Sequence, residues 1–274
     1  TGGSAIAQIN NSEPIAPFIN TLSTLLFKNN FMKLYNKEFL KTVYGMEVTN
    51  GLFMNTSLEY ENRHALFNNT DYTFIQSDDV YSSNNPLDPN NEFSIPFESH
   101  HIMKFNIGTR ILFGQKYISR PDGKLNVPNE DYPVLSFNYE KGFSASNSDY
   151  TYDFIAGRID YDKSIGNKGN FALRVKAGKF FNAEDISFID YKHFNGNQTH
   201  VNFRGNYLNA FNLLPYYSNS TNDAYIETHV EHNFKGYIMN KIPLLNKLQW
   251  NLIGSFNQIN VPDTKPYQEF SVGF

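Results

Sequence analysis

Residues 40–60 decide the fold class, and their sequence is LKTVYGMEVTNGLFMNTSLEY. From Leu40 onward, apolar or uncharged side chains occupy every second position and alternate with Lys41 and Glu47. The same alternation resumes after Asn50-Gly51 and continues to Tyr60. A period of two is typical of a β-strand, and Asn-Gly between two such runs is the strongest short hairpin signal. The stretch therefore predicts a long β-hairpin with one apolar and one charged face.

The alternating pattern recurs through the rest of the chain and predicts about nine strands from residue 39 onward. Further alternating segments lie near residues 103–111, 135–143, 150–161, 171–177, 224–231, 248–256 and 270–274. Most of these segments run for about 9–13 residues, whereas strands of soluble proteins commonly have about 5–6. A tilted strand that crosses a membrane needs about 9–11 residues. Strand length therefore favours a membrane protein.

The connections between these segments fall into two classes. Those at residues 50–51, 166–169 and 240–245 are short, whereas residues 64–98 and 182–222 form long, polar connections. Short turns at one end and long loops at the other are typical of outer-membrane barrels. We therefore expect an all-β fold, an antiparallel transmembrane β-barrel in the lipid bilayer of the bacterial outer membrane. The alternative is a soluble, carbohydrate-binding β-sandwich with an aromatic core.

Composition excludes several other classes of protein. The chain has 274 residues, a net charge of -4 and no cysteine, which rules out disulfides, cysteine-bound zinc and a thiol nucleophile. A slightly acidic chain gives no electrostatic footprint for nucleic acid. No apolar run approaches the roughly 20 residues of a transmembrane helix. Residues 1–13 are predicted to be a polar tail, and residues 14–274 the barrel domain, with a short N-terminal helix at about 15–28.

Three sets of motifs in this sequence resemble a known family. They are Phe31–Tyr35 with Tyr60–Arg63, then Ser82–Pro89 with Phe113–Tyr117, and most specifically Asp185–Gln198 with Phe211–Tyr216 and Lys241–Lys247. Together they resemble an uncharacterised outer-membrane family of the Bacteroidota, over roughly residues 14–274. Its full-length members carry a periplasmic carboxypeptidase-regulatory-like domain ahead of a large barrel. The resemblance implies an outer-membrane location but no known chemistry.

Two departures from that family affect the expected fold. The regulatory-like domain is absent from this sequence, and family members continue past the motif that ends at Phe274. We therefore expect the C-terminal portion of a larger barrel as an alternative to a complete one. A weaker similarity, carried by Arg204-Gly205, links the chain to the barrels of the outer-membrane protein assembly superfamily. In those barrels an Arg-Gly motif lies in a long loop that folds into the lumen.

The candidate site residues are polar side chains expected inside the barrel. Glu227, His229 and Glu231 occupy alternate positions of one strand and therefore share a face. This row is interpreted either as an acid–base group of a barrel hydrolase or as a lumen network that stiffens the barrel. The long 182–222 loop is rich in apolar residues and should fold into the lumen. Its Arg204 is predicted to bind one of the strand carboxylates, which are Glu59, Glu140, Glu227 and Glu231.

We expect a non-enzymatic outer-membrane barrel for transport, or for the assembly or export of envelope components. Its predicted partners are the lipid bilayer and other periplasmic or outer-membrane proteins. The sequence shows none of the usual hydrolase or phosphate-loop motifs, and no cofactor or metal ion is expected.

Overall fold

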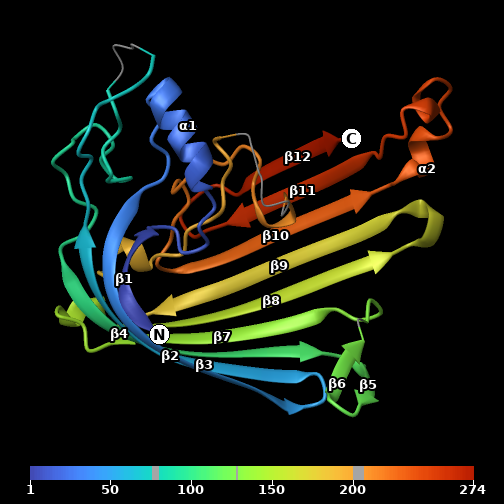
Figure 1. The fold of residues 1–274 in the computed structure, drawn as a ribbon, viewed down its shortest axis with the longest axis horizontal. Helices are drawn as coiled ribbons and strands as arrows, with labels where there is room; N and C mark the ends of the chain where they lie inside the picture. Colours follow the sequence, from blue (N-terminus) through green and yellow to red (C-terminus); the bar gives the residue numbers. More distant parts are fainter. Residues whose placement is uncertain (76–79, 128, 200–206) are drawn as a thin grey trace.

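The computed structural model describes residues 1–75, 80–127, 129–199 and 207–274 (Figure 1). The described chain consists mainly of antiparallel strands with few helices, which confirms the all-β class. Ten strands form the main sheet: β1 (Gly2–Gln8), β2 (Leu34–Thr49), β3 (Leu52–Ala65), β4 (His100–Leu112), β7 (Val134–Phe143), β8 (Tyr152–Ser164), β9 (Asn170–Phe181), β10 (Ala224–Asn233), β11 (Ile253–Asn260) and β12 (Tyr267–Gly273).

The remaining elements lie outside the main sheet. A separate hairpin consists of β5 (Lys116–Arg120) and β6 (Gly123–Val127), and the α-helices are α1 (Pro17–Phe27) and α2 (Gly236–Met239). The 3-10 turns are η1 (Ser148–Tyr150), η2 (Gly166–Lys168), η3 (Phe188–Asp190), η4 (Tyr207–Asn209) and η5 (Leu245–Lys247).

The main sheet is a single open meander. Its strand order is β1-β2-β3-β4-β7-β8-β9-β10-β11-β12, and every neighbouring pair is antiparallel. Strands β1 and β12 stand at the two edges, so the described sheet is not closed as a barrel. Figure 1 shows it as a strongly curved wall with long loops gathered at one end. The described strands do not form two facing sheets, so the sandwich architecture is not observed.

Two sequence predictions of local structure were wrong. Residues 1–13 are not simply a tail, because Gly2–Gln8 form β1, which pairs with residues 34–40 of β2. The strand predicted at 248–256 begins only at Ile253. Leu244 and Gln249 have positive φ angles of 75° and 53°, which break the extended chain before that point. The link between β10 and β11 is therefore not a short turn.

The predicted arrangement of chain connections is confirmed only in part. Turns 50–51 and 165–169 lie at one end of the sheet, here called the turn end, while connections 66–99 and 182–223 lie at the other, the loop end. However, the turn end also carries the long connection 113–133, and the loop end carries the short connections 144–151 and 261–266. Gly51 has φ 81°, and a Cβ there would lie 2.4 Å from the Leu112 carbonyl oxygen. Only glycine fits this turn, in agreement with the Asn-Gly signal.

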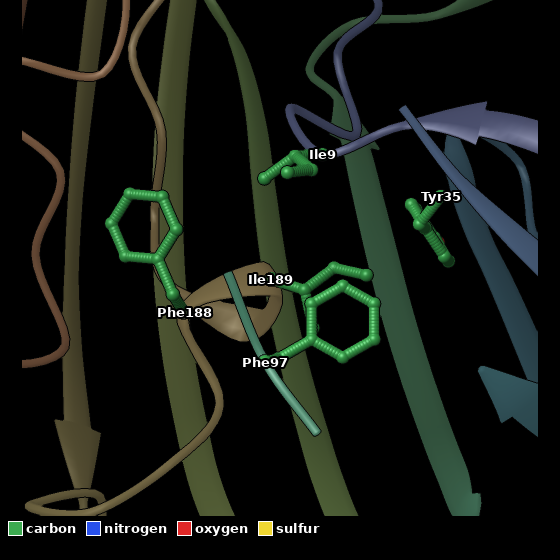
Figure 2. Packing of buried hydrophobic residues seen from close by; sticks show 5 residues of the cluster. All are labelled: Ile9, Tyr35, Phe97, Phe188 and Ile189. Atoms are coloured by element: carbon green, nitrogen blue, oxygen red, sulfur yellow. The ribbon is translucent and has the colours of Figure 1, made fainter. Parts of the chain in front are cut away.

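The two faces of the sheet differ in what covers them. Described residues 182–199 and 207–223, here called the strap, pack against the inward face and contribute to three apolar clusters. Figure 2 shows Phe188 and Ile189 of the strap beside Ile9, Tyr35 and Phe97. The outward face keeps large apolar side chains exposed among the described residues; they include Leu40, Tyr44, Phe105, Phe137, Ile155, Ile226 and Phe270. The protein thus buries its core on one side of the sheet only.

Candidate functional site

The strap is the element that shapes the inward face of the sheet. Seven of the seventeen buried apolar residues in the described chain belong to it: Ala183, Ile186, Phe188, Ile189, Phe194, Phe211 and Leu214. An isolated bridge between Lys192 and Thr221 brings its two halves together. The described part of this apolar-rich segment packs on the inward face of the sheet, while its place in a barrel lumen stays a prediction. Two polar networks then fix the strap to opposite sides of the inward face.

The first network is centred on an ion pair between the strap and β3. Arg63 donates from Nη1 to Asp190 Oδ2 at 2.7 Å and from Nη2 to Asp190 Oδ1 at 3.0 Å. The Arg63 side chain is 1% exposed and the Asp190 side chain 0%. A bidentate guanidinium–carboxylate pair combines strength with a fixed geometry. This pair therefore locks η3 at one place on the inward face.

Further charges complete the first network, here called the Arg63 network. Lys104 of β4 also contacts Asp190, with Nζ 2.5 Å from Oδ1. Arg63 Nε donates to Glu61 Oε2 at 2.7 Å, and Lys37 of β2 donates to Glu61 Oε1 at 2.8 Å. Three cations thus face two carboxylates in a buried setting. Buried charges are tolerated only when they are paired in this way, so every member depends on the others.

The protonation states of two strap residues follow from these surroundings. Burial alone would raise the pKa of the Asp190 carboxyl, but the charges of Arg63 and Lys104 outweigh burial and hold that pKa at about 2. Burial, reinforced by the charge of Lys192, lowers the pKa of His193 to about 3. His193 is therefore neutral at physiological pH, and its Nδ1 lies 2.7 Å from Ser220 Oγ within the strap.

The second network, here called the Glu269 network, joins the strap to β10, β11 and β12. The carboxylate of Glu269 accepts hydrogen bonds from the backbone N–H groups of Asn212, at 2.6 Å, and Leu213, at 3.0 Å. It also accepts a bond from Asn257 Nδ2 at 2.8 Å. Glu269 thereby pairs two backbone donors of the strap.

His229 links Glu269 to Glu227 through Asn257. His229 Nδ1 lies 2.8 Å from Asn257 Oδ1, and its Nε2 lies 2.8 Å from Glu227 Oε1. Asn257 donates its amide to Glu269, so its oxygen faces His229 and accepts from the ring. The ring is 0% exposed and lies under Phe211, at 4.8 Å between ring centroids.

The structure brings together only part of the predicted set. Glu227 and His229 are bonded as the row suggested, whereas Glu231 lines a separate hollow that it shares with Asn257. Glu59 accepts from Lys41 at 2.7 Å, and Glu140 accepts from the Tyr152 hydroxyl at 2.7 Å. These two carboxylates therefore have local partners of their own.

The predicted partner of those carboxylates, Arg204, lies outside the described residues. Sequence reasoning missed the Arg63–Asp190 pair, which joins residues 127 positions apart. The sequence did contain one signal for this pair. Arg63 follows Glu59 and Glu61 at the alternate, inward positions of its strand, and Asp190 is a single charge between apolar neighbours. The observed Arg63–Asp190 pair also reverses the predicted arrangement, because its carboxylate lies on the strap and its guanidinium on the strand.

The described residues hold neither a metal-binding cluster nor a membrane-spanning helix. No three His, Asp or Glu side chains in this part of the chain gather as a metal ion would require. Among the same residues, no helix combines the length and apolar character needed to cross a membrane.

The fold and its networks define an all-β domain built on one curved antiparallel sheet, with a strap fixed by ion pairs to its inward face. The chain belongs to the family described as "Family of unknown function (DUF5686) C-terminal domain", whose model matches residues 1–274. No curated protein matches the chain.

Proposed function

We propose that this domain is part of the wall of an outer-membrane β-barrel and has a non-enzymatic role in transport, or in the assembly or export of envelope components. The observation that carries the proposal is the inverted polarity of the sheet. Charged groups such as Arg63 and Asp190 are buried on the inward face, while large apolar side chains are exposed on the outward face. A barrel in lipid has this arrangement, because its outward face contacts hydrocarbon and its interior is polar.

The dimensions of the outward face support a lipid environment. On β2, outward positions from Leu40 to Met46, and Thr49 beyond a bulge, carry no charge. They span about 26 Å along the strand, or about 20 Å across a bilayer at a tilt near 40°. Polar pairs follow toward the loop end, where Asn62 Nδ2 donates to Glu38 Oε2 at 3.3 Å and Lys141 pairs with Asp153 at 2.9 Å. An apolar band of this height, ending in polar residues, is close to the roughly 25 Å band of a membrane barrel.

The free edges of β1 and β12 support a larger assembly. Unpaired N–H and C=O groups along a sheet edge invite pairing with other strands, and barrel closure removes such edges. We therefore take the domain as the C-terminal portion of a larger barrel, as the family description "C-terminal domain" suggests. Under this proposal, further strands of a Bacteroidota protein with a carboxypeptidase-regulatory-like domain pair with β1 and β12.

The strap favours a gated or assembly role over an open pore. It crosses the inward face from the Arg63 network on β3 to the Glu269 network on β12. A lumen filled by such a segment does not allow free diffusion. The alternative of a barrel hydrolase is disfavoured, because His229 is fully buried and both of its ring nitrogens already have partners.

Heat-modifiable gel mobility tests the proposal. The chain should fold in detergent or lipid into a form that migrates differently before and after boiling. Protease added to the folded form should spare the strands and cleave the loops. Monodisperse, folded protein in plain buffer would contradict a lipid-facing sheet. Esterase or peptidase activity that disappears in His229→Ala would support the hydrolase instead.

A further inference from the structure

A hollow of about 380 Å³ lies on the inward face, bounded by β3, β4, β7, β8, β9 and β10. Pairing register places Arg110, Ser136, Arg158 and Lys176 in one row across four adjacent strands, β4, β7, β8 and β9. All four residues line the hollow, and no Asp or Glu is among its described lining residues. This site, here called the basic hollow, shares no residue with the Arg63 network and meets the Glu269 network through Lys176, which contacts Glu227.

The charges of this row are unusual for a sheet. Arg158 and Lys176 are directly opposite each other on β8 and β9. Like charges in such cross-strand positions destabilise a sheet. Asp160 offsets one of them through a 2.6 Å contact with Arg158 Nε, and Glu227 offsets the other through a 2.9 Å contact with Lys176. Both carboxylates lie outside the lining of the hollow. Asp160 instead lines an adjacent hollow, together with Asp162 and Glu130, which Arg110 and Arg158 also border.

Arg110 provides the most available cation of the row. It is exposed, and within the described chain no acidic side chain pairs with it. Strands lie about 4.8 Å apart, so Arg110 on β4 and Arg158 on β8 are separated by about 10 Å at the backbone. Two long guanidinium side chains at that spacing can converge on one small anion, with the Ser136 hydroxyl between them.

The shape of the hollow comes from small residues in the neighbouring row. Gly108 and Ala156 flank Asn138 there, in register on β4, β8 and β7. The missing side chain at Gly108 makes room for the Asn55 amide, whose Oδ1 would lie 2.5 Å from a Cβ there, and Ala156 adds little bulk beside it. Asn138, with Asn55 on β3, offers side-chain amides beside the hollow. Amides at this position can bond hydroxyl groups, while the arginines bind charge.

We infer that the basic hollow binds a phosphate group carried on a small polyol, with the phosphate held between Arg110 and Arg158. Guanidinium groups match phosphate oxygens in a bidentate manner, which makes arginine the preferred residue for such sites. A volume of about 380 Å³ is within the range of small-molecule sites, about 300–1,000 Å³. The inference rests on the proposed function, because a barrel would make the hollow a lumen site.

Two sources can supply this chemistry, a soluble phosphate ester or the headgroup of a phospholipid. The experiment uses the full chain, folded in a zwitterionic detergent, with its gel mobility checked first. Inorganic pyrophosphate is then titrated by calorimetry at low salt. We expect saturable binding at one site that weakens as salt increases.

Variants assign the binding to the hollow. Arg110→Gln and Arg158→Gln should each weaken pyrophosphate binding about tenfold or more, because each removes a charged hydrogen-bonding partner. Arg120→Gln is the matched control, since Arg120 is exposed on β5, outside the main sheet, and its loss changes the net charge equally. Equal binding by all three variants and the unmodified protein, or no saturable binding, would overturn the inference.

A second measurement distinguishes the source of the phosphate. In phosphatidylcholine vesicles that also contain phosphatidylglycerol, a headgroup ligand should compete and reduce pyrophosphate affinity. Unchanged affinity there, with Arg110-dependent binding retained, would assign the site to a soluble phosphate ester. Failure of the barrel proposal is scored separately by gel mobility: heat-modifiable protein that does not bind pyrophosphate refutes only the hollow.

Discussion

Arginine at Val175 should be poorly tolerated, because the outward face of β9 is predicted to lie in hydrocarbon. Val175 is paired with Ile159 on β8 and Thr228 on β10 and shares the outward face with Lys179. Lys179 lies four residues nearer the loop end, about 13 Å along the strand and about 10 Å in membrane depth at a 40° tilt. The two positions therefore compare the same charge on the same strand at two depths.

The magnitude follows from that depth difference. Arginine costs about 2–4 kcal/mol near the bilayer midplane and about 0–1 kcal/mol near the interface. Val175→Arg should therefore lower the free energy of unfolding by about 2–4 kcal/mol, while Lys179→Arg should leave it nearly unchanged. If the outward face were in water, the substitution at Val175 would usually change stability by no more than about 0.5 kcal/mol.

Reversible urea unfolding from phosphatidylcholine vesicles measures this difference. Trp250, the single tryptophan, provides the fluorescence signal. Lys176→Arg is the control for the inward face, because it keeps the positive charge beside Glu227. Equal unfolding midpoints for Val175→Arg and Lys179→Arg would refute the assignment of the outward face to lipid.

Three further predictions concern the strap and the topology. Asp190→Asn should destabilise the protein by about 3–5 kcal/mol in urea unfolding, because Arg63 loses its buried counter-ion. Recovery of stability in the double variant with Arg63→Met would confirm that cause. A loss of stability below about 1 kcal/mol in Asp190→Asn would contradict it. The folded pKa of His193, about 3, is below the unfolded value of 6.5. The unfolded chain therefore binds the extra proton first, and stability should fall by about 1.4 kcal/mol per pH unit from about pH 6 to pH 3. His193→Gln should flatten that slope in acid titrations, and an unchanged slope would assign it to other groups. An epitope tag beside Phe93, which is 86% exposed at the loop end, should bind antibody on intact cells. A tag at Gly123, in the hairpin at the turn end, should bind antibody only after lysis. The opposite result would invert the topology.

The strands could be predicted from sequence because each has a local signal. Alternation around Leu40–Val48 and the Asn-Gly turn place β2 and β3 correctly. Strand β1 was missed because Gly2, Gly3 and the alanines that follow are small, so its pattern contains little contrast. Trp250 and Leu252 alternate as a strand would, but positive φ angles before them, which sequence pattern does not reveal, place both residues in a connection.

The candidate site was less predictable because it depends on contacts between distant segments. Glu227 and His229 are two residues apart on one strand, so their shared face follows from strand geometry. Arg63 and Asp190 meet only because the strap crosses the sheet, and no local pattern encodes that path. Alternation of charged residues identified which strand positions face inward, but it could not identify which inward side chains would form ion pairs with each other or with the strap.

Spin-label accessibility along β2 tests the central claim most directly, which is that the outward face of this sheet contacts lipid. The chain has no cysteine, so single cysteines can be introduced and labelled one at a time at Leu40, Lys41, Thr42, Val43 and Tyr44 in protein reconstituted in vesicles. Oxygen, which concentrates in hydrocarbon, should reach labels at 40, 42 and 44, while a water-soluble nickel chelate should favour those at 41 and 43. A two-residue period with this phase is the result the barrel wall predicts. Equal access of the nickel chelate to both sets would show that water, rather than lipid, covers the outward face.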